Sequence, residues 1–155
     1  MAKYFSFVAK NITPVSQNNR STATINRLQR DLVAAHNQKY PNDPMPKNPQ
    51  ISSDPLCAKV FYIHRVPDFK DADNISKPLW DALNGIAYVD DRQIRYLETF
   101  KIDESYPGLF EIDITEIDTI DLSAILDFFE NIQNDQDRIL YVSISDHENS
   151  NVRFI

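Results

Sequence analysis

The chain has 155 residues, 42% of them hydrophobic and 25% charged, which suits one globular domain with a real core. No basic leader followed by an apolar run and no long apolar stretch is seen, so we expect neither secretion nor membrane insertion, and a cytoplasmic location. The formal net charge of −7 argues at first against a protein that binds nucleic acid.

The N-terminal part predicts a strand, a loop and a helix. Residues 4–9 alternate weakly between apolar and polar, as a strand does, and residues 11–20 are polar enough for a loop. Residues 22–40 predict a helix. One face of this helix is expected to carry Ile25, Leu28, Leu32 and His36.

Arg27 and Arg30 fall on the opposite side of this helix and are expected to be exposed. Exposed arginines are usually only solvated, but they could also touch the phosphates of a nucleic acid. His36, the one histidine on the apolar side, is expected to be a half-buried structural residue and not a ligand.

A proline-rich loop and a buried strand come next. Residues 41–55 contain five prolines and predict an extended loop, whereas residues 56–66 are apolar enough for a central strand. Cys57, the single cysteine, cannot form an intrachain disulfide and is expected to be a small buried side chain. His64, near the end of the strand, could carry a proton, although no motif demands it.

The stretch over residues 71–94, DADNISKPLWDALNGIAYVDDRQI, holds most of the functional signal. Asp71 and Asp73 would lie on one side of an extended chain and could share a hard divalent cation. Asn74 is expected to be the N-cap of a helix over residues 75–84, which Gly85 would end.

Lys77 would then point out of the first turn of this helix, where Pro78 is also tolerated. Residues 87–89 predict a short strand that ends in Asp90 and Asp91. Each feature has an ordinary alternative: a turn for Asp-x-Asp, a solvated strand end for Asp-Asp, and a surface ion pair for Lys77 with Asp81. The ordered combination favours a functional site.

This combination resembles the RusA family of Holliday junction resolvases, the crossover junction endodeoxyribonucleases. The family hallmark is DxDNxxK, a D-A-L segment, and a hydrophobic residue before DD and a following Q. The corresponding segments are residues 71–77, 81–83 and 89–93, and a looser likeness covers residues 3–116.

The resemblance implies a homodimeric endonuclease that nicks branched DNA with Mg²⁺, for which Mn²⁺ is a candidate substitute. It implies that Asp71, Asp73 and Asp91 bind the metal and serve catalysis, and that Lys77 is required for catalysis. Asp90 is a weaker candidate ligand. Asn74 would support the Asp-x-Asp turn from behind the ligands.

In this family, the loop after the first strand carries an Asn-Asn-Arg-like cluster near the DNA, and residues 17–20 (Gln-Asn-Asn-Arg) match it. A solvated turn rich in asparagine is the equal alternative. The candidate DNA-binding residues are Asn18, Asn19, Arg20, Arg27, Arg30 and Lys70.

Beyond the motif, residues 94–102 and 109–117 predict two strands of a hairpin, joined by the turn signal at residues 105–108. Residues 121–133 predict an amphipathic helix, and alternation around residues 140–144 predicts a last strand. The part beyond residue 118 exceeds the usual end of the family. It could add core packing, or form a dimer contact or a protein-binding surface.

Charge is unevenly distributed along the chain. Residues 1–70 hold ten Lys/Arg and four Asp, a net +6, residues 71–118 carry −8, and residues 119–155 carry −5. The first half is therefore basic, and bound cations would neutralise part of the acidic excess at the proposed metal site. The acidic C-terminal part still departs from a simple DNA-binding surface.

Together the sequence predicts one α+β domain, a mixed β-sheet with helices packed mainly on one face in a two-layer, RusA-like arrangement. Residues 1–118 would form the endonuclease domain, and residues 119–155 a helix-strand extension packed on it. The predicted function is Mg²⁺-dependent, structure-selective resolution of Holliday junctions by paired nicks in DNA recombination and repair. Two alternatives stay open: a catalytically weak adaptor that binds branched DNA or, through its acidic tail, a protein; and a nuclease for flaps or forks.

Overall fold

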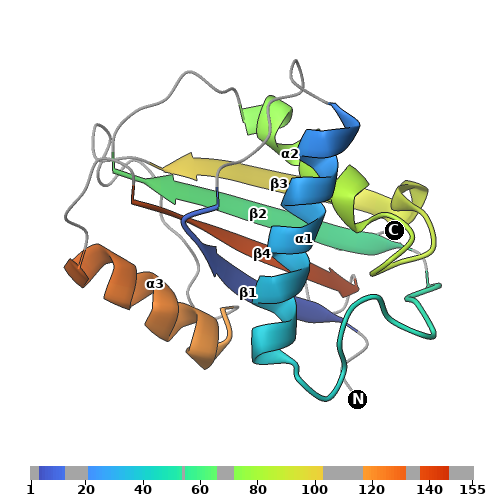
Figure 1. Ribbon diagram of the computed structural model, residues 1–155, viewed down its shortest axis with the longest axis horizontal. Coiled ribbons are helices and arrows are strands. Elements are labelled where there is room, and N and C mark those ends of the chain that lie inside the picture. Colours follow the sequence, from blue (N-terminus) through green and yellow to red (C-terminus); the bar gives the residue numbers. More distant parts are fainter. Residues whose placement is uncertain are drawn as a thin grey trace.

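The computed structural model describes residues 4–12, 21–53, 55–65, 72–102, 117–131 and 137–146. These residues form a four-stranded sheet and three α-helices (Figure 1). In chain order the elements are β1 (Phe5–Lys10), α1 (Thr22–Lys39), β2 (Leu56–His64), α2 (Ala72–Leu83), the 3-10 turn η2 (Asp91–Gln93), β3 (Ile94–Ile102), α3 (Thr119–Asn131) and β4 (Arg138–Asp146).

The sheet has the order β1-β4-β2-β3 and mixes both strand directions. β4 runs antiparallel to β1 and to β2, with Val142 opposite both Phe7 and Val60. β2 and β3 run parallel, with Phe61 opposite Phe100. The predicted single α+β domain with a mixed sheet is therefore confirmed.

The last strand that the structure describes, β4, is an interior strand of the sheet, since it lies between β1 and β2 (Figure 1). Its side chains Ile139, Leu140, Val142 and Ile144 are all buried. The predicted division of the chain at residue 118 stays a prediction, but β4 belongs to the middle of the sheet and not to its edge.

Two cores form because successive side chains of a strand point to opposite faces. On one face, Val60 and Tyr62 of β2 pack with buried residues of α1 and α2. On the other face, Phe61 and Ile63 pack with Ile125 of α3. Two of the three helices thus cover one face, as predicted, and β2 is buried on both sides, as expected for a central strand.

Helix α1 agrees with the sequence pattern. Ser21 caps its N-terminus in a reciprocal capping box with Thr24. Leu28, Leu32 and His36 are buried. At its C-terminus, Lys39 Nζ lies 2.9 Å from Asp121 Oδ2 of α3 and donates to the Ser6 carbonyl oxygen of β1 at 2.8 Å. This buried contact joins α1, the edge strand β1 and α3.

The remaining predictions concern the proline-rich loop, the hairpin and the single cysteine. The proline-rich part is a loop, as predicted, with an isolated bridge at Ile51. The strand over residues 94–102 is confirmed as β3, but the rest of the predicted hairpin, residues 103–116, lies outside the described residues. Cys57 is buried, as expected. Among the described residues, no helix is long and apolar enough to cross a membrane.

Candidate active site

Helix α2 begins earlier than predicted, at Ala72 instead of residue 75. Asn74 therefore lies inside the first turn and is not the N-cap, and Asp73 is helical instead of extended. Pro78 consequently lies inside the helix, beyond the first turn where it was predicted, and it has no N–H to give to the carbonyl group of Asn74.

The end of α2 follows the prediction within one residue. The helix ends at Leu83, and Gly85 has a φ of +79°, a conformation that glycine adopts without steric cost. The expected short strand over residues 87–89 is reduced to isolated bridges of Tyr88 with Ile51 and Asn84. The chain then enters the 3-10 turn η2.

Lys77 lies between two carboxylates that come from different elements. Its Nζ donates to Asp81 Oδ1, one turn further along α2, at 2.9 Å, and to Asp91 Oδ2 of η2 at 3.2 Å. The side chain of Lys77 is 52% exposed, whereas Asp81 and Asp91 are 16% and 20% exposed. The hydrogen bonds to Asp81 and then Asp91 raise the pKa of Lys77, so its ammonium group stays charged.

The turn that carries Asp91 is held by its neighbours on both sides. Asp90 is the N-cap of η2, and its Oδ1 accepts from the Arg92 backbone N–H at 2.9 Å. Gln93 completes a reciprocal capping box, because its Oε1 accepts from the Asp90 backbone N–H at 2.8 Å. Asp91 is therefore fixed on a short rigid turn that faces α2.

Asp90 and Asp91 have different surroundings although they are adjacent. Asp90 Oδ2 accepts from Arg92 Nε at 3.0 Å and Nη2 at 2.8 Å. These bonds lower the pKa of Asp90 to about 2. Asp90 thus caps the turn and pairs with Arg92, whereas Asp91 faces Lys77. A metal-binding role for Asp90 stays a prediction.

Tyr88 supports the site from inside the protein. Its buried hydroxyl group donates to the Trp80 carbonyl oxygen at 2.5 Å, and the Trp80 indole N–H donates to Ser76 Oγ at 2.9 Å. Burial, together with the nearby carboxylates of Asp91 and Asp81, raises the pKa of Tyr88. The phenol therefore remains a hydrogen-bond donor that ties the segment before η2 to α2.

The range that matches a known family includes this site. The family model described as endodeoxyribonuclease RusA matches residues 11–115, which is more than half of the chain. The chain belongs to the RusA family. Membership supports endonuclease activity on DNA, with Holliday junctions as the substrate of the family. No match to a curated protein is found.

The RusA motif is only partly within the described residues. The structure places Lys77, Asp81, Asp90, Asp91 and Gln93. Of these, Lys77 contacts both Asp81 and Asp91. The side chains of Asp73 and Asn74 are not described. Predicted site residues that lie outside the described residues are Asn18, Asn19, Arg20, Lys70 and Asp71.

The donor chemistry of the described site fits a hard cation. Mg²⁺ prefers oxygen ligands. Asp91 offers carboxylate oxygens, and their negative charge already attracts the Lys77 ammonium group. Among the residues that the structure describes, no three His, Cys, Asp or Glu side chains could hold a metal ion together. The predicted ligand set needs Asp71 and the side chain of Asp73, so it stays a prediction.

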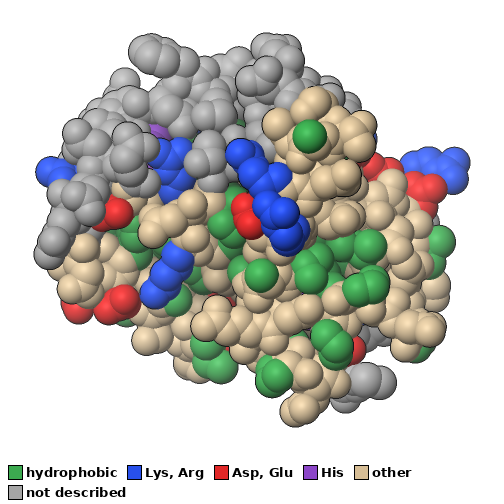
Figure 2. All heavy atoms as spheres, in the orientation of Figure 1, with side chains coloured by type: hydrophobic (Ala, Val, Ile, Leu, Met, Phe, Trp, Pro, Cys, Tyr) green, Lys and Arg blue, Asp and Glu red, His purple; other side chains and the backbone are tan. Residues whose placement is uncertain are grey.

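The predicted DNA-contacting arginines are exposed on a helix that packs beside α2. Arg27 and Arg30 are both exposed, and Gln29 Nε2 between them donates to the Ala82 carbonyl oxygen of α2 at 2.8 Å. Figure 2 shows basic side chains on this face beside the N-terminal half of α1, with acidic atoms next to them. Among the described residues, this arrangement places positive charge near α2, with acidic side chains interspersed.

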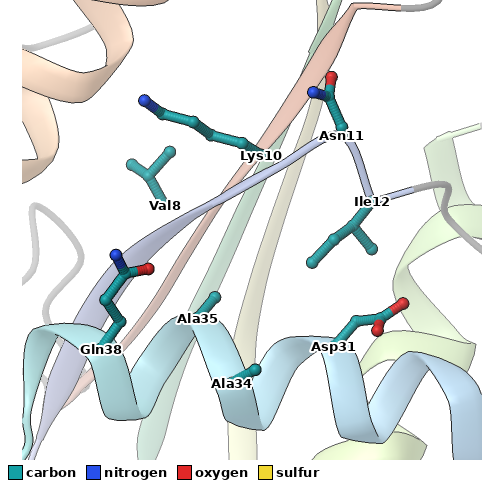
Figure 3. A pocket seen from close by; sticks show the side chains of 8 residues that line it. All are labelled: Val8, Lys10, Asn11, Ile12, Asp31, Ala34, Ala35 and Gln38. Atoms are coloured by element: carbon teal, nitrogen blue, oxygen red, sulfur yellow. The ribbon is translucent and has the colours of Figure 1, made fainter.

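A groove among the described residues lies outside this site. It has a volume of about 470 Å³ and opens between the end of β1 and α1, where Lys10, Asn11, Asp31 and Gln38 line it (Figure 3). None of its lining residues belongs to the RusA motif. We therefore assign the candidate active site from the motif geometry and not from the size of a cavity.

Proposed function

We propose that this protein is a dimeric, Mg²⁺-dependent endodeoxyribonuclease that resolves four-way DNA junctions by paired nicks. One observation carries the proposal: the Lys77 ammonium group lies between Asp81 and Asp91, within a chain of the RusA family. An ammonium group held beside a carboxylate that can bind a metal ion is well placed to stabilise the charge of a phosphate during cleavage.

Each placed residue has a distinct role in this proposal. Asp91, with Asp71 and Asp73, would hold Mg²⁺, which supplies a nucleophilic water near neutral pH and neutralises developing negative charge. Lys77 would donate to a phosphate oxygen with the N–H that its two carboxylate partners leave over, since an ammonium group has three donors. Asp81 would hold Lys77 in place, and Asp90 would hold the turn.

The substrate would be bound mainly through its phosphates. Arg27 and Arg30 would add salt-dependent contacts along α1, next to α2. The predicted contacts from Asn18, Asn19, Arg20 and Lys70 extend this surface in the proposal. A homodimer with isologous contacts would place one site on each side of a junction, which allows two matched nicks.

A panel of synthetic substrates tests the proposal. Four-way junction, replication fork, flap and linear duplex of one sequence are incubated with the protein in Mg²⁺, in Mn²⁺ and in EDTA. We expect paired nicks in the junction with either metal, little cutting of linear duplex, and none in EDTA. If flaps or forks are cut in preference to the junction, they and not the four-way junction are the substrate of the protein.

The adaptor alternative has its own signature in the same panel. Tight junction binding without cutting in either metal would contradict the nuclease proposal and favour a binding module. Light scattering at micromolar concentration tests the dimer. A stable monomer that still cuts opposite junction arms would contradict the dimeric part of the proposal.

A further inference from the structure

Gln93 uses its whole side-chain amide to fix the turn that presents Asp91. Its Oε1 accepts from the Asp90 backbone N–H at 2.8 Å. Its Nε2 donates to the Ser53 carbonyl oxygen at 2.8 Å and to the Ile51 carbonyl oxygen at 3.3 Å. Gln93 thus connects η2 to a segment about forty residues earlier in the chain.

The segment that receives Gln93 is itself attached to the residues before η2. The Ile51 backbone N–H donates to the Ala87 carbonyl oxygen at 3.2 Å, and the Val89 N–H donates to the Ile51 carbonyl oxygen at 3.1 Å. Ile51 is buried. Gln93, which follows Asp90 and Asp91 in the chain, therefore attaches η2 to a buried part of the core. Tyr88, which precedes them, attaches the chain to α2.

From this geometry we propose that Gln93 is a positioning residue for the metal ligand Asp91. The inference rests on the proposed function. Gln93 does not touch the reacting atoms, because both polar atoms of its amide are engaged by backbone groups. It acts through Asp91, whose Oδ2 must stay within reach of Lys77 Nζ, now 3.2 Å away.

The reason that such a residue matters is the strict geometry of Mg²⁺. This ion demands a nearly octahedral set of oxygens and tolerates displaced ligands poorly. Loss of a partner that orients a ligand commonly costs about 10- to 100-fold in metal affinity or activity. Removing Gln93 would free η2 to move, and the position of the Asp91 carboxylate with it.

The test compares Gln93→Ala and Gln93→Met with wild-type protein. Methionine keeps the length of the side chain but has no donor, so it preserves packing if the alanine variant folds poorly. We measure the Mg²⁺ concentration for half-maximal junction nicking, the rise in Tm that saturating Mg²⁺ gives, and junction affinity in EDTA. We expect the Mg²⁺ midpoint to rise at least about tenfold, in nicking and in thermal stabilisation alike. Junction affinity in EDTA should not change.

Asn37→Ala is the matched control. Asn37 also binds the proline-rich loop with both atoms of its amide, through the Met45 N–H at 2.7 Å and the Met45 carbonyl oxygen at 3.2 Å, but it is not part of the motif. It should lower Tm and leave the Mg²⁺ midpoint unchanged, because loosening this loop elsewhere does not move Asp91.

Two results would overturn the inference, and they can be told apart. A wild-type Mg²⁺ midpoint in both Gln93 variants, with normal wild-type nicking, would make Gln93 a structural residue and leave the proposed function intact. Absence of Mg²⁺-dependent nicking and of Mg²⁺-dependent stabilisation in the wild-type protein would overturn the proposed function and this inference with it.

Discussion

The ammonium group of Lys77 lies 3.2 Å from the carboxylate of Asp91, although fourteen residues separate them in the sequence. The helix α2 and the turn η2 bring together the two halves of the RusA motif at this contact. Because the same ammonium group also binds Asp81 at 2.9 Å, Lys77 has a fixed position on an otherwise exposed surface.

Replacing the proposed metal ligands should abolish cleavage while leaving the fold and junction binding largely intact. Asp91→Asn, Asp71→Asn and Asp73→Asn each remove a negative charge that holds Mg²⁺, and an amide cannot replace it. Junction affinity could even rise, because each change removes repulsion of phosphate. Nicking assays and filter binding check this, and wild-type nicking by any two of the variants would refute the assignment.

Asp81→Asn should reduce nicking less than loss of Lys77 does, and should leave the Mg²⁺ midpoint unchanged. Asp81 is the largest cause of the raised pKa of Lys77. Without its charge the pKa of Lys77 falls, so the ammonium group loses its proton at lower pH. The alkaline limb of the pH–rate profile should therefore move to lower pH. An unchanged limb together with a raised Mg²⁺ midpoint would instead assign Asp81 to the metal.

His36 should make the protein less stable in mild acid. Its ring is buried against Phe5, Phe7 and Tyr40, and burial lowers its pKa from 6.5. Below pH 6.5 the unfolded chain binds a proton that the folded protein resists, so stability falls as pH falls. The loss can reach about 1.4 kcal/mol per pH unit until the lowered pKa is passed.

Replacing His36 measures this contribution. Denaturant titrations between pH 7.5 and 5 should show a smaller loss of unfolding free energy for His36→Phe than for the wild-type protein, because phenylalanine cannot take up a proton. Parallel pH profiles of the two proteins would show that His36 does not carry the acid sensitivity.

Periodicity predicted most of the elements but not their arrangement. The helix over residues 22–40 and the buried strand β2 follow from the spacing of apolar residues. Alternation in β4 shows which side chains point together, but it does not state which strands are its neighbours. Its place between β1 and β2 depends on long-range pairing, as at Val142, that no local pattern encodes.

The sequence predicted which described residues form the candidate site better than it predicted where the helix that carries Lys77 begins. The motif named Lys77 and Asp91 for one candidate site, and the structure brings these two side chains together. The expectation that Asn74 caps α2 rested on the preference of asparagine for the N-cap, but the helix begins earlier, at Ala72. The structural role of Gln93 also has a signature in the sequence. Asp90 followed three residues later by Gln93 is the spacing of a capping box.

The single-turnover rate of junction cleavage by Lys77→Ala, measured in saturating Mg²⁺ beside its Tm, tests the central claim most directly. If Lys77 stabilises the phosphate, the rate should fall by about two orders of magnitude or more. Junction affinity should fall only by the effect of one lost phosphate contact. Lys77→Arg should restore the cleavage rate poorly, because the guanidinium group is larger than an ammonium group and planar. If Lys77 only pairs with Asp81 on the surface, the variant would lose a few tenths of a kcal/mol in stability and keep the wild-type rate, and that result would contradict the proposed active site.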